Sequence, residues 1–447
     1  GRPADAARGR ELLGAAVAEA ERRREALAFL AQGAGFRPKP KKAAKGKKAP
    51  AGLNPDSAPD LAECLRVLAE GEGLLTDGKL TAGGEEFNLS TQDETLTRLT
   101  ARLPEGSTVR RFAEELKAYR AAKKRADFLE DWLSKLHPVT DRLHPSLRQL
   151  NPNGVGRFSA KDPNLQQCPR GSDIRSLFRA PAGRKLVAAD YSNIEMRIMA
   201  QLSGDRNLTV AFLEEADVHR RTAAKVAGKP EDQVTKEERQ AAKPANFGGI
   251  YGIRPPSLRA KAEQDYGIRL TLEDAEKMLA GFFGLYPGVA AYHARQDRRA
   301  FEDGFEPFLR HDFERGFRVE KRPCVRTLGG RLRVWPVVER ERRDGNGTYL
   351  RKAGPFTELY NTPDQGTGAD MIKCAMARLY RELLRRGWED VRLVATVHDE
   401  LVLEVPEELA EQAAELLGAV MEAAGARFLP DVPVEVEAAV CESWAEK

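Results

Sequence analysis

The sequence predicts an α+β fold, and three observations support this prediction. The first third of the chain consists largely of segments rich in Ala, Glu, Arg and Leu, a composition typical of helices. An apolar run at 185–189 predicts a buried strand, and the helical pattern of 192–202 follows it directly. Two further apolar runs, 392–397 and 401–405, lie close enough to form an antiparallel hairpin. Strands that pair locally, with helices grouped elsewhere, are typical of the α+β class.

The N-terminal third is predicted to contain three helices and a flexible loop. Residues 5–32 form the first helix, and Ser57 stands at the N-cap position of the second. The third covers 108–136 and contains many Lys and Arg residues. The basic segment 33–52 is interrupted by prolines, which predicts a flexible loop. We expect its lysine run, Lys39–Lys48, to contact a phosphate backbone, and a solvated loop without that contact is the alternative.

The rest of the chain is predicted to change from helices to mixed elements. Residues 207–300 read as mostly helical, with breaks at Gly252, at Pro255-Pro256 and at Tyr286-Pro287-Gly288. From residue 325 onward strands alternate with helices. No internal repeat is present in the sequence.

Length and composition limit the class of protein. At 447 residues the chain exceeds what one hydrophobic core usually serves, so two or three subdomains are expected. The apolar runs are far shorter than a membrane span, and no signal peptide opens the chain. The five cysteines have no CxxC spacing, which favours a reduced intracellular protein without a zinc site or disulfide framework. Because the chain starts without methionine, we expect a fragment or a processed form.

Charge is distributed unevenly along the chain. The net charge is +4, but residues 1–50 hold thirteen Lys or Arg against five Asp or Glu, which leaves the remainder at −4. A basic N-terminal part suits binding of a phosphate backbone, and a slightly acidic remainder suits metal chemistry. A solvated basic surface is the alternative explanation.

Asp190 and Asp399 are the strongest candidates for catalysis. Each follows an apolar run that predicts a strand, although some two hundred residues separate them. A fold that joins the two strand ends would place both carboxylates in one cleft. Oxygen ligands without His or Cys select Mg²⁺ over Zn²⁺, and two such ions ~3.5–4 Å apart bind the attacking and leaving oxygens of a phosphoryl transfer. The pair therefore predicts a site for two Mg²⁺ ions.

A predicted helix between the two carboxylates carries cations and aromatic rings on one face. Four residues at intervals of four make up this face: Arg239, Lys243, Phe247 and Tyr251. Thr235 and Glu238 have the spacing of a capping box that starts the helix, and Pro244 should kink it near Gln240. Two cations followed by two aromatic rings match a triphosphate followed by a sugar and a base. An ordinary amphipathic helix with a solvated basic end is the alternative, but it does not explain the aromatic residues.

Two acidic positions have structural alternatives. Ser192 and Glu195 have the spacing of a capping box, with Ser192 as N-cap and Glu195 at the third helical position. Asp190 taken alone would be a surface carboxylate at a strand end. Asp399 and Glu400, in contrast, stand between two apolar strands, where burying adjacent acids without a cation is costly.

Taken in order, these segments resemble the polymerase region of family A DNA polymerases, the bacterial DNA polymerase I type and its phage relatives. Three motifs carry the resemblance: Asp-Tyr-Ser-x-Ile-Glu at 190–195, Arg-x3-Lys-x3-Phe-Gly-x2-Tyr-Gly at 239–252 and Val-His-Asp-Glu at 397–400. Further matches are Gly156-Arg157, Asp162-Pro163-Asn164-Leu165-Gln166, Asp217-x-His219 and Gln365-Gly366-Thr367-x-Ala369-Asp370. The resemblance is close over 154–447 and loose over the first 150 residues.

The resemblance implies a right-hand polymerase fold with an antiparallel-sheet palm, helical fingers and a helical thumb. The thumb would cover 1–153, including the basic loop 33–52. The palm would consist of 154–205 and 325–447, and the fingers would lie between them at 206–324. The resemblance further implies a template-directed DNA polymerase that adds dNTPs to the 3′ end of a primer. Such an enzyme would act as a monomer. It would lie in the cytoplasm of a bacterial or phage-infected cell, associated with the nucleoid.

The resemblance also implies a role for each motif residue. Asp190 and Asp399 would be catalytic and would hold two Mg²⁺ ions, together with the main-chain carbonyl of Tyr191. Lys243 would be catalytic as well. The residues implied to bind the incoming dNTP are Glu195, His219, Arg239, Lys243, Phe247 and Tyr251. The residues implied to contact the primer–template are Arg157, Asn164, Arg175, Gln365 and His398. Glu195 would also reject ribonucleotides by crowding the 2′ position of the sugar.

Three other functions compete with this interpretation. A single-subunit RNA polymerase shares the hand and the carboxylates, but Glu195, Phe247 and Glu400 disfavour it. A catalytically inactive DNA-binding scaffold would not need the intact carboxylate pair and Lys243. A two-metal nuclease does not explain the helix that suits a triphosphate.

Two residues depart from the family pattern. Asn193 stands where bacterial members most commonly have Gln, and Pro244 stands where Thr, Ser or Ala is usual. We expect both to affect fidelity or closure of the fingers. The segment before the palm is too short for a thumb and an exonuclease together, so we expect no proofreading or 5′-nuclease domain in this chain.

Overall fold

The computed structural model describes residues 2–38, 52–149, 155–168, 173–301, 304–312, 316–344, 347–353 and 355–447. The lysine run at 39–48 and the expected boundary between thumb and palm at 153–154 lie outside these residues. The chain divides into two compact units. Unit 1 comprises Gly1–Ala4, Arg142–Ala262 and Ile268–Lys447, and unit 2 comprises Asp5–Asp141 and Glu263–Gly267.

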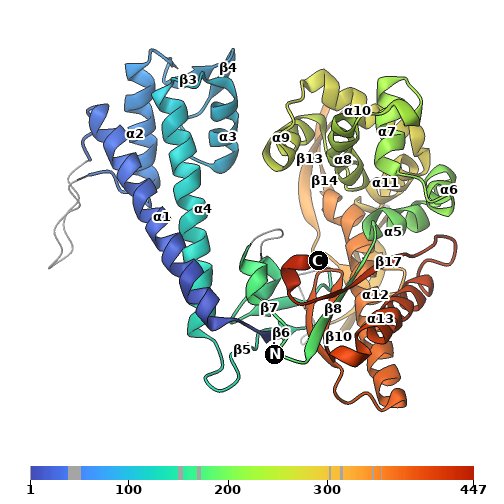
Figure 1. The fold of residues 1–447 in the computed structure, drawn as a ribbon. Helices are drawn as coiled ribbons and strands as arrows, with labels where there is room; N and C mark the ends of the chain where they lie inside the picture. The colour runs from blue at the N-terminus through green and yellow to red at the C-terminus, as the bar shows by residue number, and fades with distance from the viewer. Residues whose placement is uncertain are drawn as a thin grey trace. The chain divides into compact units, whose positions relative to one another are not determined.

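Unit 2 contains long helices and one small sheet (Figure 1). Its helices are α1 (Ala6–Gly33), α2 (Ala58–Gly71), α3 (Asp93–Arg102) and α4 (Thr108–Ser134). The three predicted helices are thus confirmed as α1, α2 and α4, and the Ser57 hydroxyl caps α2 by accepting from the N–H of Asp60. The antiparallel sheet was not predicted. It consists of β2 (Leu75–Thr76), β3 (Lys79–Ala82) and β4 (Glu85–Phe87), strands too short to show an alternating pattern.

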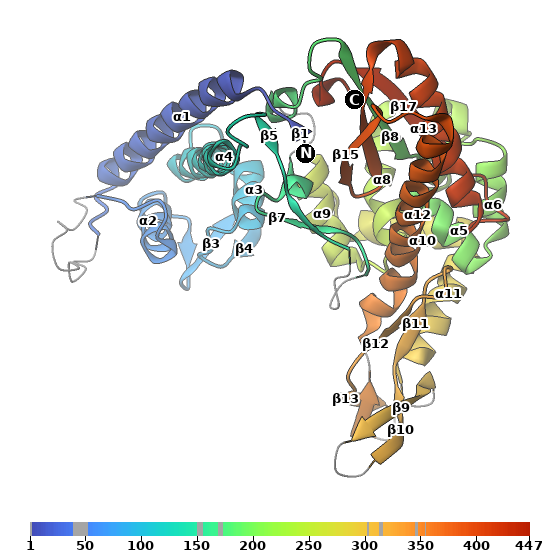
Figure 2. The ribbon, with the colours of Figure 1, turned by 90° about the horizontal axis from the view of Figure 1, so that it is seen from below.

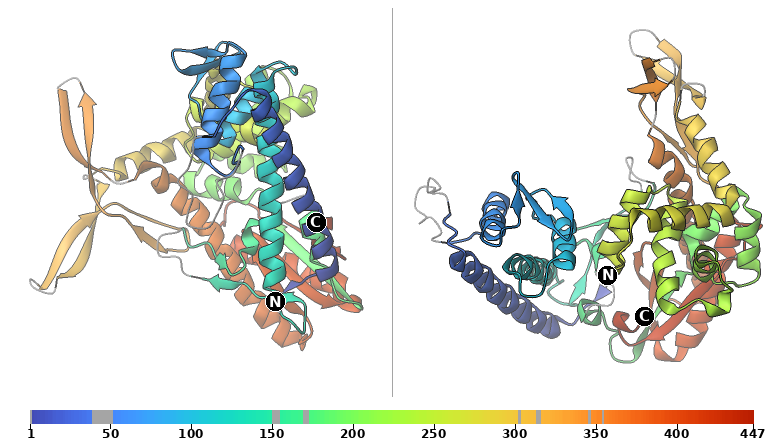
Figure 3. Two further views of the ribbon diagram at one scale, coloured as in Figure 1. Left: turned by 90° about the vertical axis from the view of Figure 1, so that its left-hand side faces the viewer. Right: turned by 90° about the horizontal axis from the view of Figure 1, so that it is seen from above.

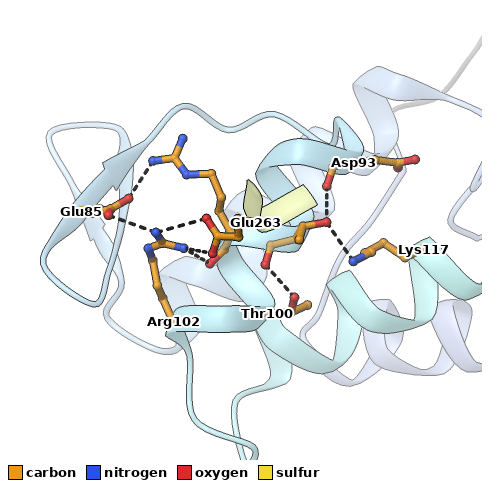
Figure 4. A network of polar contacts seen from close by, with 8 residues as sticks. Glu85, Asp93, Thr100, Arg102, Lys117 and Glu263 are labelled. Carbon is orange, nitrogen blue, oxygen red and sulfur yellow. Dashed lines mark hydrogen bonds and ion pairs between the residues drawn. The ribbon is translucent and has the colours of Figure 1, made fainter. Parts of the chain in front are cut away.

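Side-chain packing and a polar network hold unit 2 together. Its core includes the fully buried side chains of Leu27, Leu61, Leu65, Phe112 and Leu116. Arg102 on α3 donates to Glu85 at 3.1 Å and to Glu263 at 2.7 Å (Figure 4). Lys117 on α4 donates to Thr97 on α3 at 2.9 Å. The network therefore links α3 to the small sheet, to α4 and to the short segment Glu263–Gly267.

Unit 1 is organised around a four-stranded antiparallel sheet in the order β15-β16-β8-β17 (Figure 1). The strands are β8 (Arg184–Tyr191), β15 (Arg392–Val397), β16 (Glu400–Pro406) and β17 (Val436–Cys441). The predicted strand and the predicted hairpin are therefore confirmed. Two long helices, α12 (Phe356–Arg386) and α13 (Ala410–Ala426), pack together, and α13 covers the sheet. The core between them includes Val187, Leu401, Leu417 and Met421, all fully buried.

Short helices follow β8, as the sequence predicted for 207–300. They are α5 (Ile194–Ser203), α6 (Arg206–Leu213), α7 (Val218–Ala227), α8 (Lys236–Ile250), α9 (Pro255–Tyr266), α10 (Leu272–Leu285) and α11 (Pro287–Arg299). The capping box of α8 is confirmed, because Thr235 and Glu238 each accept from the other's main-chain N–H. None of the helices in the described ranges combines the length and apolar character that crossing a bilayer requires.

Several two-stranded ribbons complete unit 1. The longest are the hairpins β9–β10 (Glu306–Asp312 and Gly316–Arg322) and β13–β14 (Val338–Asp344 and Gly347–Ala353). Figures 2 and 3 show both on the side of unit 1 where α12 begins. The shorter pairs are β11–β12 (Cys324–Arg326, Leu332–Val334), β1–β5 (Arg2–Pro3, Arg142–Leu143) and β6–β7 (Ser146–Arg148, Ser159–Lys161). Helices and antiparallel strands thus confirm the α+β class.

A buried ion-pair cluster stabilises the sheet. Glu404 on β16 is fully buried, and its carboxylate lies 2.9 Å from Arg184 and 2.8 Å from Arg142. We expect Glu404→Gln to lower the free energy of unfolding by about 3 kcal/mol, because it leaves two largely buried guanidinium groups without their anion. Urea unfolding followed by circular dichroism tests this. The control is Glu382→Gln on α12. Glu382 forms an exposed ion pair with Arg385, so this substitution should leave the midpoint of urea unfolding nearly unchanged.

Candidate active site

The two predicted catalytic carboxylates lie on neighbouring strands at the same edge of the sheet. Asp190, near the end of β8, pairs across strands with Glu400 on β16 and with Glu437 on β17. Asp399 directly precedes Glu400, in the two-residue turn between β15 and β16, where His398 has a left-handed φ of +55°. Both carboxylates line one pocket of about 500 Å³. The structure therefore joins the two strand ends as the sequence predicted.

Part of the predicted site lines this pocket and part does not. The predicted residues along its wall are Arg157, Asp190, Tyr191, Glu195, Phe247, Gln365, His398 and Asp399. The predicted residues that do not line it are Asn164, Arg175, His219, Arg239, Lys243 and Tyr251. A larger pocket of about 690 Å³ lies beside α6 and α7, and no predicted site residue lines it.

The residues at the sheet edge suit a hard cation. Asp190 Oδ1 is enclosed and has no hydrogen bond within the described residues, although Lys447 Nζ lies 2.5 Å away as an ion pair. No group of three or more His, Cys, Asp or Glu side chains in the described ranges could hold a metal. A cation here would depend on Asp190, Asp399 and a main-chain oxygen, with its remaining positions filled by water or a ligand. This set fits Mg²⁺, which keeps several waters instead of an all-protein cage.

Arg197 holds the turn that carries Asp190 into α5. Its side chain is only 3% exposed, and it donates to the carbonyl of Ser192 at 2.9 Å and to that of Pro433 at 2.6 Å. Glu435 completes the contacts with an ion pair at 2.6 Å. Because the buried Arg197 guanidinium bonds the main chain directly after β8, the end of this strand has little freedom to move. The fold therefore fixes the position of Asp190.

The capping box predicted for Ser192 and Glu195 is wrong. The helix α5 begins at Ile194, and its N-cap is Asn193, which has a left-handed φ of +49° and makes no side-chain cap. Asparagine tolerates this conformation better than most residues. The helix thus starts one residue later than the box requires, and Glu195 faces the pocket. There its carboxylate accepts a hydrogen bond from Arg157 at 2.6 Å.

The cationic turn of α8 lies against α7. Arg239 forms an ion pair with Asp217, the N-cap of α7. His219 is 5% exposed, and burial lowers the pKa of its ring to about 4, so the ring is neutral at pH 7. Asn246 Nδ2 lies 2.9 Å from His219 Nδ1, and because an amide nitrogen is a donor, the ring proton belongs on Nε2. The His219 ring lies 5.4 Å from that of Phe247, which connects α7 to the pocket wall.

Two residues predicted to contact primer–template serve local structure. The Arg175 guanidinium, 6% exposed, lies 4.0 Å over the ring of Trp444, whose Nε1 donates to Glu400 at 2.7 Å. Asn164 accepts a hydrogen bond from the N–H of Gln166 at 3.2 Å. Their DNA contacts stay a prediction, as do those of Arg157, Gln365 and His398 at the pocket.

Comparison with known proteins decides the family. The sequence model described as DNA polymerase family A matches residues 39–446. The chain belongs to DNA polymerase family A. Among curated members, DNA polymerase I of Pseudomonas aeruginosa is 40% identical over 333 residues, covering 73% of this chain and 32% of that protein. Thermostable DNA polymerase I of Thermus aquaticus is 35% identical over 384 residues, covering 85% of this chain and 40% of that protein.

A solved structure supports the same family A fold. The POL domain of Pol1 from M. smegmatis, in complex with DNA primer-template and dNTP, matches with a TM-score of 0.73 and 25% identity. The match covers 100% of this chain and 67% of that one. The fold class predicted from the sequence, the α+β polymerase fold, is thereby confirmed. This family A chain spans about a third to a half of the length of the curated relatives it matches.

Sequence reasoning missed several residues that line the pocket of this family A chain, among them the acids Asp364 and Glu437. Asp364 on α12 lines the pocket floor, is fully buried, and neither of its carboxylate oxygens has a hydrogen-bond partner within the described residues. A helical pattern could have found it. Asp364 and the fully buried Met371 and Ala375 stand at helical intervals on α12, so they lie on the same face. Asp364 is therefore an acid on the apolar face of a helix.

Proposed function

We propose that this chain is a template-directed DNA polymerase that adds dNTPs to the 3′ end of a primer. The observation that carries the proposal is the placement of Asp190 and Asp399 at one sheet edge, in a pocket that Glu195 and Phe247 also line. Family membership supports it, as do the primer-template and dNTP named for the M. smegmatis structure. Primer extension with purified protein, dNTPs and Mg²⁺ tests it, and a chain that extends no primer would contradict it.

Each motif residue has a chemical task in this proposal. Mg²⁺ held by Asp190 and Asp399 would supply charge stabilisation for the attacking and leaving oxygens of the phosphoryl transfer. Lys447 is paired with Oδ1 of Asp190 in the structure, so a cation that binds this oxygen would have to displace the ammonium group. The Tyr191 side chain is tied by its hydroxyl to the carbonyl of Met421 at 2.9 Å, which leaves only its main-chain carbonyl for the metal.

The triphosphate would bind along α8 and α7. Arg239 and Lys243 supply positive charge one helical turn apart. Lys243 is also the proposed donor to the leaving pyrophosphate. Neutral His219 can donate from Nε2, because Asn246 occupies its other nitrogen. Phe247 and Tyr251 follow on the same helix and would face the sugar and the base.

The domain roles and the setting belong to the same proposal. The thumb would cover residues 1–153 and include most of unit 2, the palm would cover 154–205 and 325–447 and include the four-stranded sheet, and the fingers would cover 206–324 and include α6–α11. The partners would be primer–template DNA and dNTPs, bound by a monomer at the nucleoid. Proofreading is not part of the proposed activity. Sedimentation with and without a primer–template duplex tests the monomer, and a 3′-labelled primer tests for exonuclease.

Glu195 is proposed to exclude the 2′-hydroxyl of a ribonucleotide. We expect Glu195→Ala to raise ribonucleotide incorporation relative to dNTP incorporation by roughly 5- to 150-fold, the equivalent of about 1–3 kcal/mol for a displaced or unpaired polar group. Competition between rNTP and dNTP at one template position measures this. Because Glu195 makes no capping box, the variant should lose little stability.

The control for this prediction is Glu435→Ala. Glu435 contacts the same helix through Arg197 but does not line the pocket. Equal discrimination in the wild type and Glu195→Ala, or an equal change in Glu435→Ala, would show that Glu195 does not guard the sugar.

A further inference from the structure

The floor of the pocket contains a carboxyl group that the proposed reaction does not use. Asp364 is fully buried on α12, and both of its oxygens lack a hydrogen-bond partner within the described residues. A buried carboxylate without a donor is strongly disfavoured, whereas the protonated acid costs far less. Burial, reinforced by the nearby Glu195 carboxylate, accordingly raises the pKa of Asp364 well above its ordinary value.

The groups that face Asp364 come from four elements. Glu195 on α5 and Arg157, before β7, are the charged ones, and they are joined to each other at 2.6 Å. The phenols of Tyr251, at the end of α8, and Tyr292, on α11, interact with Asp364 as well, and burial is the main cause that raises the pKa of both. Both phenols therefore stay protonated. The pocket floor thus holds two carboxyl groups and a single guanidinium among these neighbours.

We propose that Asp364 and Glu195 act as a coupled carboxyl pair that keeps one proton on Asp364, and that this proton sets how strongly the site rejects ribonucleotides. The inference rests on the proposed role of Glu195 at the sugar. Two acids that share one nearby cation cannot both ionise cheaply in a buried site, so one of them retains its proton. Arg157 pairs with Glu195, which leaves Asp364 as the acid that keeps it.

The two protonation states differ in their effect on Glu195. With Asp364 neutral, Glu195 stays paired with Arg157 at the pocket wall. With Asp364 ionised, its charge repels Glu195 and attracts Arg157, which weakens that pair. Asp364 is therefore a positioning residue that acts through Glu195. Discrimination against ribonucleotides should then weaken as the pH rises through the pKa of Asp364.

Stability tests the neutral acid without any need for catalysis. Near pH 4, close to the ordinary pKa of an aspartate, the unfolded chain still binds the proton about half of the time and the folded chain binds it fully, so wild type and Asp364→Asn should differ little. As the pH rises, the unfolded chain releases the proton while the folded chain keeps it, and the wild type loses stability. The Tm of Asp364→Asn should therefore exceed that of the wild type at pH 8, by a margin that narrows steadily toward pH 4. If this difference in Tm is absent, or does not change with pH, Asp364 is not a neutral acid in the folded chain.

Asp370→Asn is the matched control for stability. It lies on the same helix as Asp364, but its carboxylate accepts from Arg331 at 2.8 Å and from Thr327 at 2.7 Å. Removing its charge should lower the Tm at pH 8, the opposite of the effect expected for Asp364→Asn.

The second arm measures sugar discrimination between pH 6 and 9.5. The ratio of rNTP to dNTP incorporation is recorded at one template position, so that changes in the overall rate cancel. We expect the ratio to rise with pH in the wild type by roughly threefold or more, the scale of one altered polar contact, and to stay flat in Asp364→Asn. Asp370→Asn should follow the wild type.

The two arms separate failure of this inference from failure of the proposed function. A wild type whose ratio does not change with pH, or an Asp364→Asn variant that follows it, overturns the role of Asp364 in discrimination. A chain that incorporates no nucleotide contradicts the proposed function, and the inference about sugar discrimination then fails with it. The stability arm still decides whether Asp364 is a neutral acid in that case.

Discussion

We expect replacement of Asp399 by asparagine to abolish nucleotide addition and to leave primer–template binding nearly unchanged. The amide keeps the size of the side chain but removes its charge, so the edge of the sheet holds a cation far less tightly. We expect the rate to fall by on the order of 10³-fold or more, the equivalent of about 4 kcal/mol of lost transition-state stabilisation. Asp190→Asn should behave in the same way, because the two carboxylates lie at one sheet edge and line one pocket.

Binding of DNA should survive these substitutions because affinity for nucleic acid comes mainly from phosphate contacts. Single-turnover primer extension measures the rate, and fluorescence anisotropy at a stated salt concentration measures the affinity. Asp431→Asn provides the charge control, since it also removes one acid but contacts Gln201 outside the pocket. Substantial extension by Asp399→Asn, or an equal loss in Asp431→Asn, would remove the carboxylate pair from the mechanism.

Local signals in the sequence were sufficient for the principal elements of both units. Ser57 and Thr235 each cap the helix that they were predicted to start, because N-cap chemistry depends on only a few neighbouring residues. The strand before Asp190 and the hairpin around Asp399 were found from apolar runs, since buried strands leave a continuous hydrophobic pattern. Such features are encoded within a few residues of where they occur.

The exposed hairpin β9–β10 could not be predicted in this way. Leu309, Phe317 and Val319 are each about 70% exposed, so no buried face imposes an alternation on the sequence. The strands are instead held by their ladder and by cross-strand contacts, such as the ring contact of 5.0 Å between His311 and Phe317. Pairing of this kind depends on residues opposite each other in space, which a pattern along one strand does not reveal.

The candidate site, like the fold, was predicted in part. Motif spacing identified the carboxylates and the face of α8, but it could not show that Asn193 would adopt a left-handed conformation. That single backbone angle removes the expected capping box and turns Glu195 toward Arg157. Asp364 was missed for a different reason: its helical spacing places it on an apolar face, but only the packing around it shows that the side chain is fully buried and faces the pocket.

Phe247→Tyr should remove discrimination against dideoxynucleotides. Phe247 lies two helical turns beyond Arg239 on α8 and lines the pocket that contains both carboxylates. When phosphates bind the cations of this helix, its ring should lie beside the sugar. A phenylalanine ring offers no hydroxyl there, so the 3′-hydroxyl of the nucleotide itself must supply the polar contact that orders the triphosphate. A dideoxynucleotide lacks that group and should react more slowly.

The expected margin is that of a hydrogen bond lost near charge, about 1.5–3 kcal/mol, or roughly 10- to 150-fold. Tyrosine at 247 returns a hydroxyl to the same space and should bring the ratio of dideoxy- to deoxynucleotide incorporation close to one. Competition between the two nucleotides at one template position measures this ratio.

Phe283→Tyr is the matched control for this prediction, because it adds the same hydroxyl on α10, away from the pocket wall. It should discriminate as the wild type does. If the wild type already accepts both nucleotides equally, the ring of Phe247 does not face the sugar. If Phe247→Tyr still discriminates, the tyrosine hydroxyl does not take the place of the nucleotide's 3′-hydroxyl. The triphosphate would then bind α8 in a direction other than the one that Arg239 and Lys243 define.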